Sequence, residues 1–203
     1  MMSSTMSDRS SPNDAHDLTA VHEDILSTLK LTELPTWAKG FSDNPHVLKG
    51  LWEMMKGFLE HSDIPPLLQE LIIFSISRFN HSPYCTDYHA GRALRLNTAL
   101  APQDLLDISN GDSHGQIPES YQVAVNTATA YANGICKLNE AHLSALHAQG
   151  FSEPQIVDIM GLIALSNTFN SYSINLNFQQ TSSDCIPEEW ASQSTKNGCR
   201  KHD

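Results

Sequence analysis

The segment that follows Pro65 and Pro66 constrains the fold most, because it joins a helix start to a sequence with apolar residues on several faces, LLQELIIFSISRF. Proline suits the first turn of a helix, where its missing N–H would have no intrahelical partner. One stripe of this helix carries Leu68, Leu71, Ile72, Ser75, Ile76 and Phe79, while Ile73 and Phe74 lie on other faces. A helix that is apolar around its circumference has to be surrounded by other elements, so this helix is predicted at the centre of the core.

The rest of the chain shows helical periodicity, and no segment alternates as a strand does. Capping residues mark several helix starts: Asn44 before Pro45, Ser82 before Pro83, Asn139, and Ser152 with Gln155 as a capping box. Helices are predicted over residues 18–29, 45–60, 66–79, 83 onward, 102–108, 118–133, 140–149 and 153–177. The expected fold class is therefore all-α, a helical bundle with short connections.

One domain is predicted over residues 18–180, between two polar tails. Residues 1–17 contain almost no large apolar side chains and are expected to form a disordered leader. Residues 181–203 form a polar C-terminal tail in which Ile186 and Trp190 are the candidate anchors.

An internal echo favours two related helical halves within the domain. Three residues of the central helix recur ninety positions later: Ile73, Phe79 and Asn80 correspond to Ile163, Phe169 and Asn170. The second half lacks a counterpart of the Cys and the His that follow the first helix.

The composition excludes several classes of function. A net charge of −11 with only twelve Lys and Arg argues against binding to nucleic acid. The longest apolar stretches, residues 71–74 and 159–165, are much shorter than the ~20 residues that span a bilayer. Residues 1–17 lack the apolar segment of a secretory signal, so a cytoplasmic protein is expected. Four scattered cysteines, Cys85, Cys136, Cys185 and Cys199, are expected to be reduced thiols.

Glu70, Cys85 and His89 are the candidate catalytic residues, with Ser82 and Tyr84 beside them. Cys85 falls at the third position of a predicted helix, where free amides and the helix dipole favour a thiolate of lowered pKa. His89 lies one turn on, so its imidazole can take the thiol proton. Partial burial of Glu70 would raise the pKa of its carboxyl and make it a base near neutrality. Together the three groups could form a proton relay.

Each of these residues also has a purely structural interpretation. Glu70 can be a solvated helix residue, Cys85 a small buried apolar residue, and His89 a core histidine with a satisfied hydrogen bond. A zinc site is another alternative, because His81, Cys85 and His89 are spaced by four. His81 precedes the predicted helix and no fourth ligand is near, so neither a metal nor a cofactor is expected.

The segment from Glu70 to His89 resembles the signature of the alkylhydroperoxidase-like (AhpD-like) and carboxymuconolactone decarboxylase superfamily. Its peroxidase members carry a Glu, a CxxC pair that begins twelve residues on, and a His four residues beyond the second Cys. Glu70, Cys85 and His89 fit this spacing, and Ser82 stands at the place of the first Cys. The lead-in PPLLQELII, Asn80, Tyr84 and the later HLSALHAQGFSEPQIVDIMGLIALSNTFN extend the resemblance to the peroxidase-related branch over about residues 30–180.

The resemblance implies an all-helical domain that assembles as a dimer, trimer or hexamer. In the peroxidase members the second Cys attacks the peroxide, helped by the Glu and the His through a water, and the first Cys resolves the sulfenic acid as a disulfide. Ser82 cannot perform that second step, because a hydroxyl does not condense with a sulfenic acid. Another thiol would have to replace it: Cys136, Cys185, Cys199, one from a neighbouring subunit, or a small thiol.

The leading hypothesis is a thiol-dependent, antioxidant peroxidase in which Cys85 attacks a small-molecule hydroperoxide, His89 is its proton partner and Glu70 is the base behind it. Its reductant is an unidentified thiol. The first alternative is acid–base chemistry on a small carboxylated or lactone substrate, as in the decarboxylase branch. The second alternative is a catalytically silent oligomer.

Overall fold

The structure, a computed structural model, describes residues 12–112, 115–132, 138–179 and 190. These residues form helices and contain no strand, which confirms the all-α prediction. The helices are α1 (Pro12–Leu29), α2 (Thr36–Lys39), α3 (Pro45–His61), α4 (Pro66–Phe79), α5 (Pro83–Leu96), α6 (Pro102–Asn110), α7 (Glu119–Ala132), α8 (Glu140–Ala148) and α9 (Glu153–Asn175).

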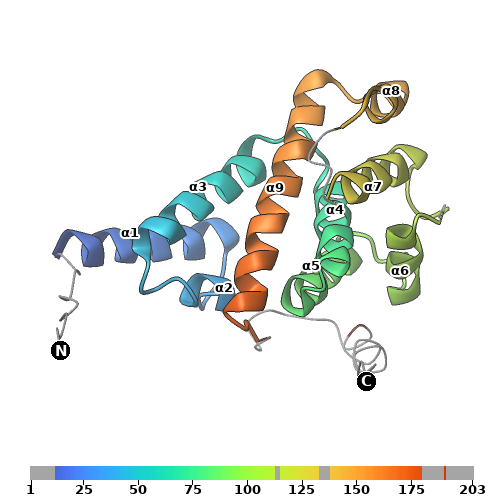
Figure 1. The fold of residues 1–203 in the computed structure, drawn as a ribbon. Coiled ribbons are helices and arrows are strands. Elements are labelled where there is room, and N and C mark those ends of the chain that lie inside the picture. Colours follow the sequence, from blue (N-terminus) through green and yellow to red (C-terminus); the bar gives the residue numbers. More distant parts are fainter. Residues whose placement is uncertain (1–11, 113–114, 133–137, 180–189, 191–203) are drawn as a thin grey trace, which may run out of the picture.

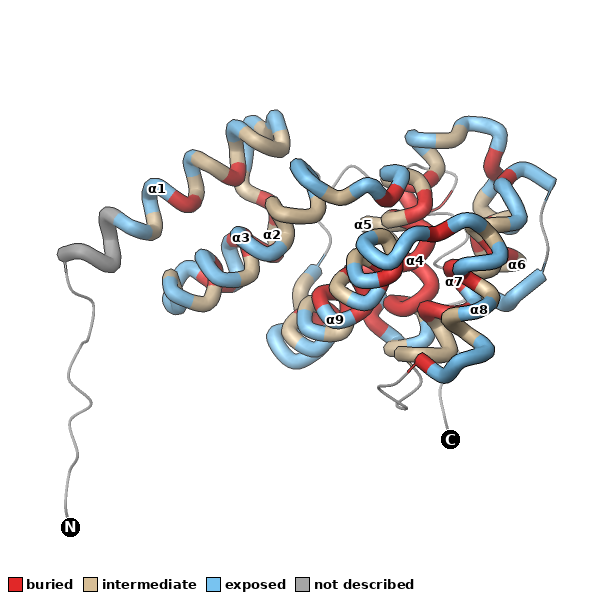
Figure 2. Tube along the Cα trace, turned by 90° about the horizontal axis from the view of Figure 1, so that it is seen from above, coloured by how far each residue is buried: buried red, intermediate tan, exposed pale blue. Residues whose placement is uncertain are grey.

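Helix α4 lies at the centre of the bundle, as its sequence predicts. It packs against α5, α6, α7 and α9 (Figure 1). Its buried residues come from several faces: Leu68, Glu70, Leu71, Ile72, Phe74, Ser75, Ile76 and Ser77. Figure 2 shows the same helix as a mostly buried tube among more exposed neighbours. Burial on all sides places Glu70, a charged residue, inside the protein.

The first three helices form an arm with a core of its own. In Figure 2, α1 and α3 extend away from the helices around α4. The arm's core contains Trp37, Trp52 and other apolar side chains, and Tyr84 and Cys85 from the start of α5 also belong to it. Ala90 and Ala93, further along α5, pack in the larger core around α4. Helix α5 therefore joins the two cores, and Cys85 lies at the junction.

Helices α4 and α9 are linked by two reciprocal hydrogen bonds. Ser77 Oγ donates to Asn170 Oδ1 at 2.9 Å, and Asn80 Nδ2 donates to Asn167 Oδ1 at 2.7 Å. The ninety-residue offset seen in the sequence maps Ser77 onto Asn167 and Asn80 onto Asn170. The Ser77–Asn170 bond is therefore related to the Asn80–Asn167 bond by exchange of the two helices. A local two-fold axis between α4 and α9 produces this arrangement.

The capping residues predicted at the helix starts form capping contacts at some starts and not at others. Asn139 accepts a hydrogen bond from the His142 amide, and Ser152 with Gln155 forms the predicted capping box. Asn44 and Ser82 stand at N-cap positions, but neither side chain makes a capping hydrogen bond. Helix α1 begins at Pro12, inside the predicted leader, whereas residues 1–11 lie outside the described residues.

Trp190 is buried in the main core, as expected for an anchor of the C-terminal tail. Its ring makes an edge contact with Phe74, and its Nε1 donates to Asp87 Oδ1 at 2.7 Å. Ile186, the other predicted anchor, lies outside the described part of the chain. Among the described helices, none combines the length and apolar content needed to cross a bilayer.

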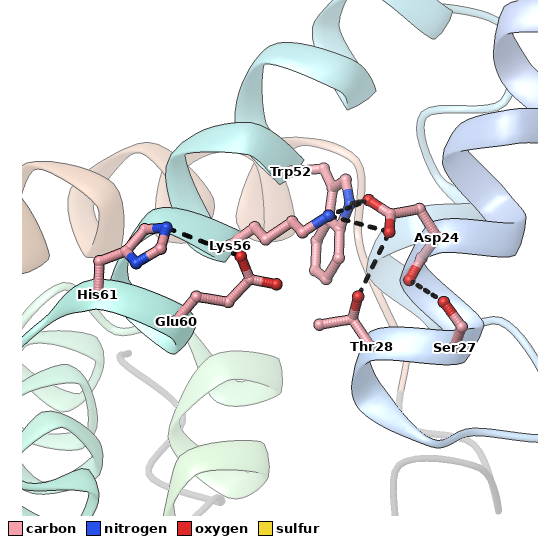
Figure 3. A network of polar contacts seen from close by, with 7 residues as sticks. All are labelled: Asp24, Ser27, Thr28, Trp52, Lys56, Glu60 and His61. Carbon is pink, nitrogen blue, oxygen red and sulfur yellow. Dashed lines mark hydrogen bonds and ion pairs between the residues drawn. The ribbon is translucent and has the colours of Figure 1, made fainter.

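A polar network holds α1 against α3. Asp24 accepts hydrogen bonds from Trp52 Nε1 at 2.7 Å and from Lys56 Nζ at 2.9 and 3.0 Å (Figure 3). These bonds lower the pKa of Asp24 below its usual value, the bond to Lys56 most and that to Trp52 next. Both donors come from α3 and the acceptor from α1, so Asp24 fixes how these two helices of the arm pack together.

Asp24→Asn is expected to loosen the arm. The change removes the charge that holds Lys56 and weakens the bond to the Trp52 indole. We expect the free energy of unfolding to fall by about 1 kcal/mol, less than the ~1.5–3 kcal/mol of a hydrogen bond to a buried charged group, because Asp24 is partly exposed. Urea unfolding measures the change. The control is Glu23→Gln, the exposed neighbour on α1, and equal losses in the two variants would contradict the role of Asp24.

Candidate active site

A cavity of about 90 Å³ lies where the arm meets the main body. Helices α1, α2, α3 and α9 contribute only apolar or uncharged side chains to its lining, and the ionisable groups come from α4 and α5. The lining residues are Leu29, Trp37, Met55, Phe58, Leu59, Gln69, Glu70, Ile73, Tyr84, Cys85, Tyr88, His89, Arg92, Leu162, Leu165, Ser166, Phe169 and Asn170. The three predicted catalytic residues therefore share one cavity, with Tyr84 in its wall.

The buried Glu70 carboxylate is held by two groups of α5. Its Oε2 lies 2.6 Å from His89 Nδ1, and its Oε1 accepts a hydrogen bond from Arg92 Nε at 2.5 Å. His89 and Arg92 are three residues apart, so both project from one face of α5 toward α4. One carboxylate thus positions an imidazole and a guanidinium at the cavity.

The protonation of Glu70 differs from the prediction. Burial alone would raise the pKa of its carboxyl, but the paired His89 and Arg92 outweigh burial and hold the pKa below its usual value. Glu70 is therefore an anion at neutral pH and cannot be the base near neutrality that the sequence predicts. Partial burial was inferred correctly, but the sequence reasoning missed Arg92, which its spacing from His89 could have indicated.

Cys85 lies in the first turn of α5, and its thiol is 6% exposed. Its Sγ donates a hydrogen bond to Ser173 Oγ of α9 at 3.6 Å. Burial raises the pKa of the Cys85 thiol, and hydrogen bonds with Ser82 and Ser173 lower it only in part. The lowered pKa predicted from the helix terminus is wrong, because the packing of the arm and α9 over this terminus removes the water that a thiolate needs.

Ser82 and Tyr84 take structural positions on either side of this turn. Ser82 is fully buried, and its hydroxyl lies 2.6 Å from that of Ser173 instead of capping α5. Tyr84 stacks on Tyr88 with ring centroids 6.2 Å apart and meets Phe178 edge-on. The aromatic rings close the cavity wall, and the serine fills the place beside the sulfur.

The three residues of the zinc alternative do not gather at one point. His81 is exposed and has a left-handed backbone (φ 55°) before α5, whereas Cys85 is buried within it. Within the described ranges, no group of three His, Cys, Asp or Glu side chains is arranged to hold a metal ion.

Part of the chain is similar to a known protein family. Residues 45–108, from the first residue of α3 into α6, match the Carboxymuconolactone decarboxylase family. The matched segment contains Glu70, Cys85 and His89, so it is also the segment that supplies the ionisable lining of the cavity. No curated protein sequence matches the chain.

Solved structures show that the fold extends well beyond the matched segment. A peroxidase-related protein with an alkylhydroperoxidase AhpD core from Ralstonia eutropha JMP134 has 16% identity and a TM-score of 0.72, over 92% of this chain and 100% of that one. A peroxidase-related protein from Silicibacter sp. TM1040 has 19% identity and a TM-score of 0.68, over 85% and 88%. A substituted form of the debrominase Bmp8 with 2,3,4-tribromopyrrole has 18% identity and a TM-score of 0.69, over 94% and 98%. The chain therefore has the AhpD-like fold.

Helix α9 contributes polar groups that the sequence reasoning did not assign to the site. Asn170 is 1% exposed and lines the cavity. Its Oδ1 accepts from Ser77, and its Nδ2 has no hydrogen-bond partner within the described structure. Ser173, three residues on, contacts Cys85. Only the packing of α9 on α5 reveals these residues, since they lie some ninety positions from the motif.

The ion pairs of Glu70 predict how stability depends on pH. Because the folded pKa of Glu70 lies below its unfolded value of ~4.3, its contribution is fully present above that pH and is lost as pH falls through the folded pKa. Glu70→Gln leaves Arg92 without its counter-ion, and we expect a loss of about 3 kcal/mol in unfolding free energy at neutral pH, the low end for a broken buried pair because Arg92 is partly exposed. Urea unfolding should show this difference shrinking below about pH 4.

The matched control for this change is Glu60→Gln. Glu60 lies at the end of α3 and its carboxylate is 3.8 Å from the exposed imidazole of His61. We expect no comparable loss in this variant. A difference between wild type and Glu70→Gln that stays constant from neutral to acid pH would contradict the ion-pair account.

The contact between Phe58 and α9 predicts a limit on the size of the reagent that can reach Cys85. An ideal Cβ built on Gly161 of α9 would lie 2.5 Å from Phe58 Cζ, closer than any real contact. Gly161→Ala must therefore push the Phe58 ring away from α9, toward the cavity that it lines. A Phe58 ring that has moved toward the cavity leaves less room for a large reagent, and room can be regained only by further displacement of side chains, which costs ~1–3 kcal/mol. We therefore expect alkylation of Cys85 by a bulky maleimide to slow about tenfold relative to alkylation by iodoacetamide.

Gly57→Ala is the control for this substitution. Gly57 precedes Phe58 on α3, and a Cβ there meets nothing within 4 Å. Mass spectrometry of the Cys85 peptide measures both rates. The same ratio of bulky to small reagent in both variants would show that the Phe58 contact does not set the size of the cavity.

Proposed function

We propose that the protein is a single-cysteine thiol peroxidase that reduces small organic hydroperoxides in this cavity. The observation that carries the proposal is that Cys85, His89 and the anchored Glu70 carboxylate line one cavity. The family match and the AhpD-like fold, shared with peroxidase-related proteins, also support it.

His89 is the base in this proposal. The ionised Glu70 can only accept a hydrogen bond, so His89 Nδ1 donates to it, and in this scheme Nε2 of the neutral imidazole accepts the thiol proton. The carboxylate fixes this tautomer and stabilises the imidazolium, as the acidic member of a catalytic triad does. Since burial raises the pKa of the thiol, Cys85 needs such a base at the moment of attack. Its hydrogen-bond partners in the described structure are serines, so the proton passes to His89 through a water or a small movement of the sulfur.

The proposed reaction has two stages. The Cys85 sulfur attacks the terminal oxygen of ROOH, the O–O bond breaks, and the imidazolium of His89 gives its proton to the leaving alkoxide. The products are ROH and Cys85 sulfenic acid. A first outside thiol then condenses with the sulfenic acid and releases water, and a second thiol reduces the mixed disulfide, which restores Cys85.

Because Ser82 is not a thiol, this scheme needs a resolving thiol from elsewhere in the chain, from a second subunit or from a small molecule. The Ser82 hydroxyl occupies the resolving position and cannot form a disulfide. Cys136, Cys185 and Cys199 lie outside the described residues, so their part in resolution remains a prediction. A thiol from a second subunit or a small thiol is equally compatible with the exposed face of the cavity.

The walls of the cavity favour an organic hydroperoxide over hydrogen peroxide. Most of the lining is apolar, and it includes the aromatic rings of Trp37, Phe58, Tyr84, Tyr88 and Phe169. Apolar walls contribute binding energy only to a substrate with an apolar group. Acid–base chemistry on a carboxylated substrate is less well supported, because the lowered pKa of Glu70 removes one of its two proton carriers at neutral pH.

Trapping of sulfenic acid tests the proposal. The full chain is treated with limiting tert-butyl hydroperoxide and dimedone, and the four cysteine peptides are compared by mass spectrometry. We expect the adduct on Cys85, none after Cys85→Ala, and a rate about a hundredfold lower in His89→Ala, as loss of a general base implies.

The three other cysteines are internal controls in the same sample. Their oxidation under conditions that leave Cys85 unmodified would refute the peroxidase function. A reaction that persists in Cys85→Ala would instead favour proton-transfer chemistry by His89.

A further inference from the structure

Two buried hydroxyls accompany the Cys85 sulfur. Ser173 Oγ of α9 lies 3.6 Å from Sγ and 2.6 Å from Ser82 Oγ, which precedes α5. Both serines are buried, and neither belongs to the lining of the cavity that Cys85 reaches. The sulfur therefore has a reactive side that faces the cavity and a second side that contacts hydroxyls.

The hydrogen-bond directions follow from the acceptors. The Ser173 hydroxyl donates to the backbone carbonyl of Asn170 at 3.0 Å. Its oxygen is then the acceptor for the Cys85 S–H and for the Ser82 hydroxyl. In the thiol form, each of these three hydrogens has an acceptor.

A thiolate requires the opposite polarity, because it can only accept. Hydroxyl hydrogens rotate about the C–O bond without movement of heavy atoms. Ser173 or Ser82 can therefore turn its hydrogen from an oxygen to the sulfur when Cys85 loses its proton. Hydrogen bonds to a buried anion are stronger than those between neutral groups, so this change favours the thiolate.

We propose that Ser173, paired with Ser82, is a positioning residue that holds the Cys85 sulfur in both its thiol and its thiolate forms. The pair occupies the place beside the sulfur that a resolving thiol would need and supplies hydrogen-bond donors there. It also closes this side of the sulfur, so the outside thiol reaches Cys85 through the cavity.

The ionisable groups that face the cavity are few and lie on two helices. Glu70 comes from α4, and Tyr84, Tyr88, His89 and Arg92 come from α5 with Cys85 itself. The lining contributed by α1, α2, α3 and α9 has no ionisable side chain. A shift in the Cys85 titration on removal of a serine hydroxyl therefore reports on the hydroxyl pair.

The pH profile of Cys85 alkylation tests the proposal. Iodoacetamide reacts with the full chain across about pH 6–11, and mass spectrometry follows the Cys85 peptide. In Ser173→Ala we expect the midpoint to rise by about one pH unit and the rate at a fixed pH below it to fall about tenfold, the loss of one hydrogen bond to an anion. Ser173→Thr keeps a hydroxyl and should restore the wild-type profile.

Ser166→Ala is the matched control. Ser166 is also buried on α9, and its hydroxyl donates to the Leu162 carbonyl at 2.6 Å rather than to Cys85. A Ser173→Ala profile that coincides with that of Ser166→Ala would overturn the proposal. If Ser173→Ala does not fold, Ser82→Ala provides the same comparison, and an unchanged midpoint there has the same meaning.

A double variant tests whether the serines act as a pair. The effects of Ser82→Ala and Ser173→Ala should not add, because each hydroxyl orients the other. Strict additivity would contradict the pairing.

This inference rests on the proposed function only in taking Cys85 as the reacting residue. Alkylation involves no peroxide, so failure of sulfenic-acid trapping with a normal serine effect would refute the function alone. Trapping that succeeds with no serine effect would refute the hydroxyl pair alone.

Discussion

The Glu70 carboxylate lies inside the protein between an imidazole and a guanidinium, and the arrangement of the site depends on this pairing. A buried charge is costly unless it is paired and hydrogen-bonded. His89 and Arg92 meet that requirement from one face of α5, and in doing so they fix α5 against α4. The same contacts direct the free face of the imidazole to the cavity. The anion is therefore both a structural link between two helices and the hydrogen-bond partner that orients the His89 ring.

The position of the cavity follows from the way α5 joins two cores. Its first turn packs with the arm, and its later residues pack around α4. The arm and α9 supply most of the apolar wall, including Trp37, Phe58 and Phe169, while the ionisable groups are on α4 and α5. This division places the ionisable side chains of the cavity next to an apolar wall. It also makes the wall sensitive to the Asp24 network that holds α1 on α3 (Figure 3).

The two long helices α4 and α9 explain what surrounds the sulfur. The chain breaks after α4 and begins α5 at Pro83, whereas α9 continues unbroken to Asn175. The ninety-residue offset maps Asn170 onto Asn80 in the break and Ser173 onto Pro83 at the start of α5, and the Ser173 hydroxyl contacts Cys85. A local two-fold relation thus places an uninterrupted helix opposite an interrupted one. The interrupted helix carries the thiol, and the continuous helix carries the hydroxyl that contacts it.

The sequence by itself determined the all-α fold, the central α4 and the grouping of Glu70, Cys85 and His89, because these follow from periodicity, capping and spacing along one chain segment. It did not determine their protonation. Only the tertiary structure brings Arg92 to Glu70 and buries Cys85 under α9 and the arm, and these contacts lower the pKa of the carboxyl and raise that of the thiol. The pKa of a buried group depends on neighbours that are distant in sequence and on the water they displace, and a local motif contains neither.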